Sequence, residues 1–321
     1  MIFEKKVLNI YHKTLLTRHD ADGKIFYFSK EDFDGLMCDE YFFSGDKGQK
    51  LSAYLYYKGE KRTDKLVMFD HGMGNGHVAY LREINRITDE GYTVFTYDHT
   101  GTRCSGGDSI GGFSQSLSDL DRAVSFVRTI DEYEDAEIVV IGHSWGGFST
   151  MNIPALHPEI THVVALAGFI SPKAIQEQFF SGPLKFYRKA IYKEECEAFP
   201  DYVSYDGRVS LKDSRTKALI IHSRDDATCK FDAHFAKLQE ALGDSENVEL
   251  LAVDGKGHNP NYTKEAVRAK NEFSKKLTEK NKKKALVTDE EKAAFIASFD
   301  WYKITEQDED VWNKIFEFIE K

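Results

Sequence analysis

Short runs of β-branched and aliphatic residues alternate with amphipathic stretches along most of the chain. The apolar runs predict buried strands, over residues 65–70, 92–98, 138–141, 161–167, 217–222 and 248–253. Apolar residues at helical spacing between them predict helices, as at 81–88 and 117–130. Parallel strands need a crossover connection, usually a helix, so this order predicts a mostly parallel sheet flanked by helices.

The strand predicted at 138–141 leads directly into Gly142-His143-Ser144-Trp145-Gly146. This Gly-x-Ser-x-Gly spacing predicts a tight turn between a strand and a helix, because glycines tolerate the close approach that such a turn requires. Serine is a weak nucleophile at neutral pH, and it needs exposure, a nearby base and backbone N–H groups. We therefore expect Ser144 to be a nucleophile at the apex of the turn.

The later strands supply an acid and a base. Residues 217–222 run into Asp225 and Asp226, and residues 248–253 run toward His258. The carboxyl ends of parallel strands meet at one edge of the sheet, where open α/β sheets hold their ligands. The sequence thus predicts that Ser144, an aspartate and His258 lie together, with either aspartate as the acid.

A glycine-rich segment follows the strand predicted at 65–70. Three glycines occur between residues 72 and 76, so backbone N–H groups can converge on one point. This suits an oxyanion hole to which the amide of Met73 contributes.

Five ordered motifs make the chain resemble the α/β-hydrolase superfamily, in its serine aminopeptidase-like, monoacylglycerol-lipase-like and carboxylesterase branch. The motifs are His71-Gly72-Met73-Gly74, Asp98 with Gly101, Ser105 and Gly107, the segment Gly142-His143-Ser144-Trp145-Gly146-Gly147, His222 with Asp226, and Gly257-His258. The resemblance implies an α/β-hydrolase fold with a helical cap insertion.

The same resemblance assigns roles to individual residues. It implies Ser144 as the nucleophile, His258 as the base and then the acid, and Asp226 as the carboxylate that orients His258. The family usually places this acid four residues after the strand-end histidine, which favours Asp226 over Asp225. The amides of Met73 and Trp145 would form the oxyanion hole. Departures from the family pattern are Arg103 and Ser223, where glycine is common, and Pro154 in the helix after Ser144.

The chain divides into a core and three additional segments. We expect the core at 41–168 and 217–321, after an N-terminal extension at 1–40 in which 6–16 is a candidate helix and 23–28 a candidate strand.

Residues 169–216 are rich in aromatic residues, and a connection this long is usually functional, so we expect a cap whose aromatics face the substrate. The polar loop at 98–107 is a candidate for the lining of the mouth of the site. A charged C-terminal arm, a helical insertion at about 262–310, is expected to pack at the periphery, with a partner or homodimer contact as its alternative role.

Composition excludes several classes of function. A net charge of −10 argues against general binding to nucleic acid or to anionic lipid. Four scattered cysteines suggest neither a disulfide framework nor a zinc site, and no apolar run approaches the length of a membrane span. The amino terminus lacks the pattern of a secretion signal. We expect a cytoplasmic protein that needs no cofactor or metal and binds neither membrane nor nucleic acid.

These features together predict a serine hydrolase that cleaves a small-molecule carboxylic ester through an acyl-enzyme intermediate. A peptidase of the serine aminopeptidase type and a thioesterase are alternatives that use the same three residues, as is hydroperoxidase chemistry. An aminopeptidase would need acidic residues near the substrate's ammonium, and 169–216 contains candidates in Glu177, Glu194, Glu195 and Glu197. A non-catalytic, ligand-binding protein on a hydrolase fold is the alternative from another class.

Overall fold

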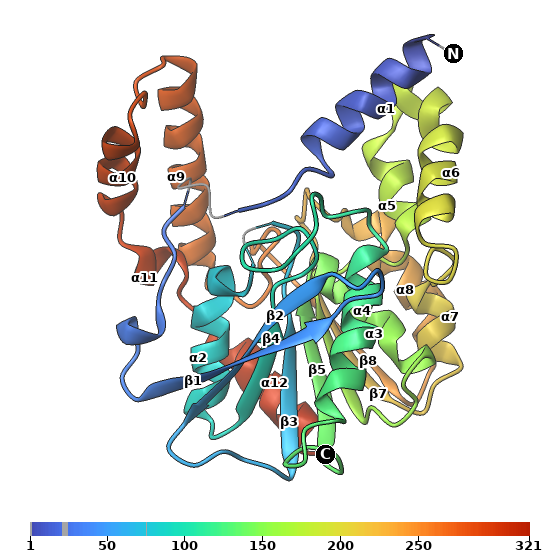
Figure 1. Ribbon diagram of the computed structural model, residues 1–321, viewed down its shortest axis with the longest axis vertical. Helices are drawn as coiled ribbons and strands as arrows, with labels where there is room; N and C mark the ends of the chain where they lie inside the picture. The colour runs from blue at the N-terminus through green and yellow to red at the C-terminus, as the bar shows by residue number, and fades with distance from the viewer. Residues whose placement is uncertain (1, 21–24, 75) are drawn as a thin grey trace.

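The computed structural model describes residues 2–20, 25–74 and 76–321, and its centre is one eight-stranded sheet (Figure 1). The strands stand in the order β1-β2-β4-β3-β5-β6-β7-β8. Their bounds are β1 Leu36–Ser44, β2 Lys50–Lys58, β3 Lys65–Asp70, β4 Thr93–Tyr97, β5 Glu137–His143, β6 His162–Leu166, β7 Lys217–Ser223 and β8 Val248–Val253. β2 pairs antiparallel with β1 and β4, and every other pairing is parallel. The predicted α/β fold, a mostly parallel sheet with flanking helices, is confirmed.

Helices cover both faces of the sheet, so the central strands are buried on both sides. The covering helices are α2 Leu81–Asp89, α3 Gln115–Val127, α4 Trp145–Asn152, α8 Phe235–Leu242 and α12 Glu309–Ile319. Along β5, Ile138 and Val140 join one hydrophobic cluster, whereas Val139 and Ile141 join the other. This alternation, with apolar residues on both faces, explains why the strand reads as an uninterrupted apolar run.

Two helical extensions rise above the edge of the sheet on opposite sides (Figure 1). One, here called the insertion, comprises residues 169–216 with α5 Pro172–Phe179, α6 Arg188–Ala198 and α7 Gly207–Lys212, and α1 Ile2–Thr14 lies beside it. The other, here called the arm, comprises residues 262–310 with α9 Lys264–Lys282, α10 Asp289–Ala297 and α11 Trp301–Ile304. The two extensions therefore flank the carboxyl ends of the parallel strands.

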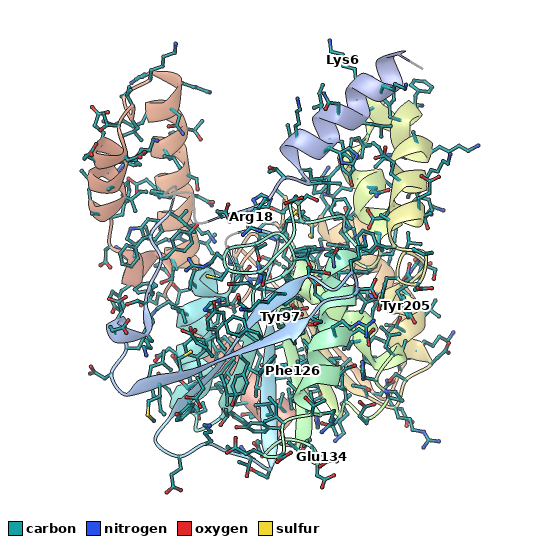
Figure 2. The ribbon with its side chains drawn as sticks, in the orientation of Figure 1. Lys6, Arg18, Tyr97, Phe126, Glu134 and Tyr205 are labelled. Atoms are coloured by element: carbon teal, nitrogen blue, oxygen red, sulfur yellow. The ribbon has the colours of Figure 1, made fainter. Side chains whose placement is uncertain are left out.

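The segments near the amino terminus connect to both extensions. His12 on α1 pairs with Glu194 on α6 at 2.8 Å. Farther along, Phe26 stacks on Trp301 of the arm, with ring centroids 6.0 Å apart. Between these points the guanidinium of Arg18, labelled in Figure 2, donates to the carbonyls of Ser105 and Gly107 at 2.9 and 2.8 Å.

The first strand is held by aromatic packing. Phe43 on β1 lies 5.6 Å from the ring of Tyr97 on β4 and 5.4 Å from that of Phe126 on α3 (Figure 2). β1 begins at Leu36, so the predicted boundary between extension and core, at residue 40, falls inside a strand.

Other local predictions have mixed outcomes. The candidate helix at 6–16 corresponds to α1, which begins earlier and ends at Thr14. Of the candidate strand at 23–28, residues 23 and 24 lie outside the described part and 25–28 form no strand, so that prediction is wrong where the structure tests it. No helix in the described ranges combines the length and the apolar character needed to cross a membrane.

Candidate active site

Ser144 lies at the sharp turn between β5 and α4, and its backbone is strained. Its φ of 58° and ψ of −108° lie outside the regions that residues with a side chain ordinarily adopt. The turn is possible because its neighbours lack side chains. A Cβ on Gly142 would collide with the carbonyl of Gly146, and one on Gly146 would collide with the carbonyl of Asp70. The predicted strand, tight turn and helix are therefore present.

Three of the predicted site residues form a continuous chain of hydrogen bonds. His258 Nε2 lies 2.8 Å from Ser144 Oγ, and His258 Nδ1 lies 2.7 Å from Asp226 Oδ2. An ionised carboxylate only accepts hydrogen bonds, so Nδ1 carries the proton and Nε2 is left to accept from the serine hydroxyl. This is the tautomer that a base acting on Ser144 requires.

Asp226 is buried and held in its ionised form. Burial alone would raise its pKa, but hydrogen bonds from His222 and His258 lower the pKa below its usual value. Its other oxygen accepts from the backbone N–H groups of Thr228 and Cys229 at 2.7 and 3.0 Å. The carboxylate is thus available to orient His258 at neutral pH.

The neighbouring Asp225 has a different position. It is exposed, and its carboxylate accepts from the hydroxyl of Ser223 and from the backbone N–H groups of Gly255 and Gly257. These bonds brace the loop that precedes His258. The structure therefore brings Asp226, and not Asp225, to the imidazole.

Of the two residues predicted for the oxyanion hole, Trp145 directly follows Ser144 in the chain and Met73 lies at the cavity that contains Ser144. Met73 borders the same cavity as Ser144 and His258. Trp145 is the first residue of α4, where a backbone N–H has no carbonyl partner within its own helix. Its side chain is fully buried, and its indole N–H donates to the carbonyl of Phe113 at 2.7 Å. The positions suit the predicted role, which depends on a bound substrate and remains a prediction.

His143 connects the glycine-rich loop to the base, a role that the sequence did not reveal. Its Nε2 lies 2.7 Å from the carbonyl of His258, and its Nδ1 lies 2.8 Å from the hydroxyl of Tyr80. That hydroxyl also accepts from the backbone N–H of Gly72 at 3.1 Å. Burial lowers the pKa of His143 to about 3, so the ring is neutral and donates from Nε2 alone. Only the position of His143 in the Gly-x-Ser-x-Gly motif hinted at this contact.

The loop at 98–107, a candidate for the lining of the mouth, does not line the site. Asp98 is fully buried and accepts from the backbone N–H and the Nδ1 of His77, at 3.0 and 2.8 Å. The hydroxyl of Ser105 donates to the carbonyl of Asp98. Arg103 takes a positive φ of 38°, which explains why glycine is common there in the family. The loop closes on itself, and none of its residues borders the cavity at Ser144.

A cavity of about 310 Å³ contains Ser144 and His258, and the arm forms much of its wall. Its lining includes Phe26 and Phe28 of the N-terminal segment and Tyr262, Phe273 and Trp301 of the arm. No described residue of the insertion borders it. The expectation that the aromatics of 169–216 face the substrate is therefore wrong for this cavity. Some of them pack inward instead, as Phe169 does on Phe148 and Phe113, and others such as Phe186 are exposed on the surface. The arm, expected at the periphery, is part of the site.

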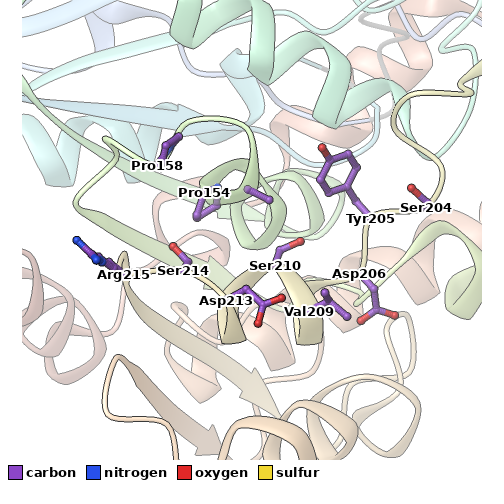
Figure 3. A pocket seen from close by; sticks show the side chains of 11 residues that line it. Pro154, Pro158, Ser204, Tyr205, Asp206, Val209, Ser210, Asp213, Ser214 and Arg215 are labelled. Atoms are coloured by element: carbon purple, nitrogen blue, oxygen red, sulfur yellow. The ribbon is translucent and has the colours of Figure 1, made fainter.

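A larger cavity, of about 730 Å³, lies away from this chemistry. Figure 3 shows its walls, to which Pro154, Tyr205 and Arg215 contribute, and it contains neither Ser144 nor His258. Among the described residues no group of three or more His, Cys, Asp or Glu side chains is arranged to hold a metal ion.

Comparisons with known proteins agree with the fold and the order of motifs. The family model described as serine aminopeptidase, S33, matches residues 61–196, which include Met73, Ser144 and Trp145. The chain resembles the α/β-hydrolase superfamily in this segment and shares its fold. The predicted resemblance to this superfamily is confirmed, and the solved structures that share this fold include several esterases.

Individual proteins resemble this chain over part of its length. A putative non-heme haloperoxidase of Mycobacterium phage D29 is 30% identical over 160 residues, covering 48% of this chain and 54% of that protein. Epoxide hydrolase 4 of Mus musculus is 23% identical, covering 46% of this chain and 40% of that protein. The chain thus spans about half the length of the curated relatives it matches.

The structural likeness extends over more of the chain. The Pyrococcus furiosus esterase Pf2001 covers 80% of this chain and 96% of its own, with 20% identity and a TM-score of 0.58. An acetyl xylan esterase from Paenibacillus sp. R4 covers 80% of this chain and 88% of its own, with 17% identity and a TM-score of 0.54. At these identities the likeness establishes the shared fold.

Proposed function

We propose that this protein cleaves small carboxylic esters through Ser144, His258 and Asp226. The observation that carries the proposal is the hydrogen-bond chain from Ser144 Oγ through both nitrogens of His258 to Asp226, at 2.8 and 2.7 Å. A serine hydroxyl aligned on an imidazole that a buried carboxylate orients is the arrangement that acyl transfer to water requires.

The reaction follows from these contacts. Ser144 Oγ attacks the ester carbonyl while His258 Nε2 accepts its proton, and Asp226 stabilises the imidazolium that forms. The backbone N–H groups of Met73 and Trp145 donate to the oxyanion of the tetrahedral intermediate. His258 returns the proton to the departing alcohol, leaving an acyl-Ser144 ester. A water molecule then repeats the sequence on this ester and releases the carboxylic acid.

The lining of the cavity favours an ester over a peptide with a free amino terminus. Among the described residues that border the cavity none is Asp or Glu, so none would pair with an ammonium group. The acids considered for that role belong to the insertion, and Glu195 there accepts instead from the backbone N–H of Ser114 at 2.7 Å. The serine in the turn also distinguishes this site chemically from one that uses a carboxylate nucleophile.

Labelling and turnover test the proposal together. A fluorophosphonate probe is expected to label the native protein and not Ser144→Ala, and the substitution is expected to lower ester kcat by about 10³-fold or more. Ser274→Ala is the matched control, because this serine borders the same cavity while His258 contacts only Ser144 of the two. It is expected to keep the label.

The choice of substrates separates the alternatives. Turnover is compared for p-nitrophenyl esters of graded acyl length, the corresponding thioesters and aminoacyl p-nitroanilides. Cleavage of the anilides alone would establish a peptidase, and a strong preference for thioesters would establish a thioesterase. A native protein that neither takes the label nor turns over any of these substrates would overturn the proposal in favour of a non-catalytic role.

A further inference from the structure

The cavity beside Ser144 is mostly apolar, and its polar lining includes one lysine. Aliphatic and aromatic side chains make up most of its wall, among them Ile25, Phe28, Val78, Phe273, Trp301 and Ile304. Lys270, on α9, is the one lysine or arginine among the described lining residues, and no lining residue there is acidic. A substrate in this cavity therefore meets a single fixed cation in a mostly apolar environment.

Lys270 is poorly neutralised by the protein itself. Its Nζ donates to Asn259 Oδ1 at 2.8 Å and lies 5.2 Å from the ring centroid of Tyr262. Within the described residues Lys270 forms no ion pair. The lysines elsewhere on α9 differ from it, since they are exposed to water and Lys276, for example, pairs with Glu272 at 2.6 Å.

Glu83 is the acidic residue whose charge acts on Lys270, but its hydrogen bond goes to another residue. Glu83 is buried, and its carboxylate accepts from Asn261 Nδ2 at 3.2 Å. Burial raises the pKa of Glu83 toward the neutral form, and burial lowers the pKa of Lys270 for the corresponding reason. An ammonium taken out of water is costly unless an anion accompanies it. A negatively charged ligand would supply this anion.

We propose that Lys270 binds a carboxylate carried by the ester substrate, so that the preferred substrates are small esters with an apolar body and one negative charge. This inference rests on the proposed esterase function, because it names the substrate class of the same cavity. The carboxylate forms a charge-assisted hydrogen bond with Nζ, while the aromatic residues of the arm and of 25–28 enclose the apolar part. A substrate ammonium would be repelled by the same group.

Matched esters of one length test the charge preference. The 4-methylumbelliferyl esters of hexanoate, adipate and 6-aminohexanoate present a neutral, an anionic and a cationic end on similar acyl chains. A second pair, phenyl hexanoate and 4-carboxyphenyl hexanoate, places the carboxylate on the leaving group instead. The native protein is expected to prefer the anionic member of at least one set, which also shows on which side of the ester the carboxylate binds.

Substitutions of Lys270 assign this preference to one side chain. Lys270→Met keeps the length of the side chain and removes its charge, and it is expected to lower the anionic-to-neutral ratio of kcat/KM by about 10- to 100-fold, mainly through KM. Lys270→Arg is expected to restore part of the ratio. Lys275→Met, an exposed position on the same helix, is the control and is expected to leave the ratio unchanged.

A binding measurement keeps this inference separate from the catalytic one. Calorimetry with Ser144→Ala measures the affinity for monomethyl adipate and for methyl hexanoate without turnover, and the anion is expected to bind more tightly only while Lys270 is present. If no ester were hydrolysed but this difference were found, the esterase proposal would fail and the carboxylate site would stand. Equal affinities, or an equal loss of kcat on neutral and anionic esters in Lys270→Met, would show that Lys270 merely positions Asn259 and would overturn the inference.

Discussion

The arm and the insertion both rise above the sheet edge that carries Ser144, yet they contribute differently to the site (Figure 1). The arm supplies aromatic residues and Lys270 to the wall of the cavity. The insertion borders this cavity at none of its described residues. Its α5 instead contacts the loop that carries Asp226, where Gln178 Nε2 donates to the carbonyl of Thr228 at 2.7 Å. One extension therefore shapes the space for substrate, and the other supports the acid loop.

This difference shows that neither the aromatic content of a segment nor its location in the sequence reliably predicts whether it lines a site. The insertion is rich in aromatic residues, but Phe169 and Phe199 are almost completely buried within the core cluster. The arm is strongly charged, but its charges lie mostly outward and its Phe273 and Trp301 face the core and the cavity. Aromatic residues more often pack an element than bind a ligand.

Truncating one phenylalanine in each extension gives the largest expected effect. Phe273 in the arm is 3% exposed and Phe199 in the insertion is 2% exposed, so each change to alanine is expected to lower the free energy of unfolding by about 3–5 kcal/mol. Only Phe273→Ala removes a wall of the cavity at Ser144. It is expected to shift the preferred acyl length toward longer chains, whereas Phe199→Ala leaves the preference in place.

Two measurements check this comparison on the same proteins. Urea denaturation gives the loss of stability, and kcat/KM for p-nitrophenyl esters of increasing length gives the preference below the unfolding transition. A shift of preference in Phe199→Ala as large as in Phe273→Ala would show that the insertion also shapes the cavity.

The elements that the sequence predicted well are determined by local patterns. The strands and the turn at Ser144 follow from short apolar runs and from glycines at fixed spacing, and both were correctly predicted. The order of Ser144, Asp226 and His258 at the ends of successive strands also follows from a parallel sheet. Choosing Asp226 over Asp225 required the family resemblance, because both follow the same strand and only the geometry distinguishes them.

The residues that line the cavity could not be predicted from the sequence, because contacts between distant segments bring them together. Phe26 and Trp301 are far apart in the chain, and no periodicity of either segment indicates that their rings stack. The bond from Tyr80 to His143 is similar, since each residue is unremarkable in its own segment. Such pairings depend on the tertiary fold, and local patterns in a single sequence do not indicate them.

The arm and the insertion can also be compared through one buried glutamate near each, with a smaller expected effect on stability. Burial raises the pKa of Glu83 beneath the arm and that of Glu195 in the insertion. Each glutamate therefore binds a proton more tightly in the folded state than in the unfolded state. Its contribution to the free energy of unfolding is complete below the ordinary pKa of 4.5 and is lost as pH rises through the raised folded-state pKa. Glu83→Gln and Glu195→Gln are therefore expected to gain stability relative to the native protein as pH rises.

The size of this gain is expected to differ between the two positions. The charge of Lys270 partly opposes the shift at Glu83, whereas no cation contributes to the shift at Glu195. Urea denaturation between about pH 5 and pH 8 should thus show the steeper relative gain for Glu195→Gln. Parallel unfolding curves for native protein and both variants across this range would contradict the prediction, as would the steeper gain at Glu83.

The smallest expected effect comes from the support that α5 gives to the acid loop. Gln178 Oε1 accepts from the backbone N–H of Lys230 at 2.9 Å, in addition to the bond that its Nε2 donates to Thr228. Gln178→Ala removes these two bonds, each worth about 1 kcal/mol, together with the contact of Oε1 to His234 Nε2 at 3.2 Å, and kcat is expected to fall by about tenfold or less. The preferred acyl length is expected to stay the same, because Gln178 acts on the position of Asp226 and not on the cavity. Glu177→Ala, an exposed neighbour on the same helix, is the control in the same ester assay. A change of acyl preference in Gln178→Ala would place the insertion at the substrate and remove the distinction between the two extensions.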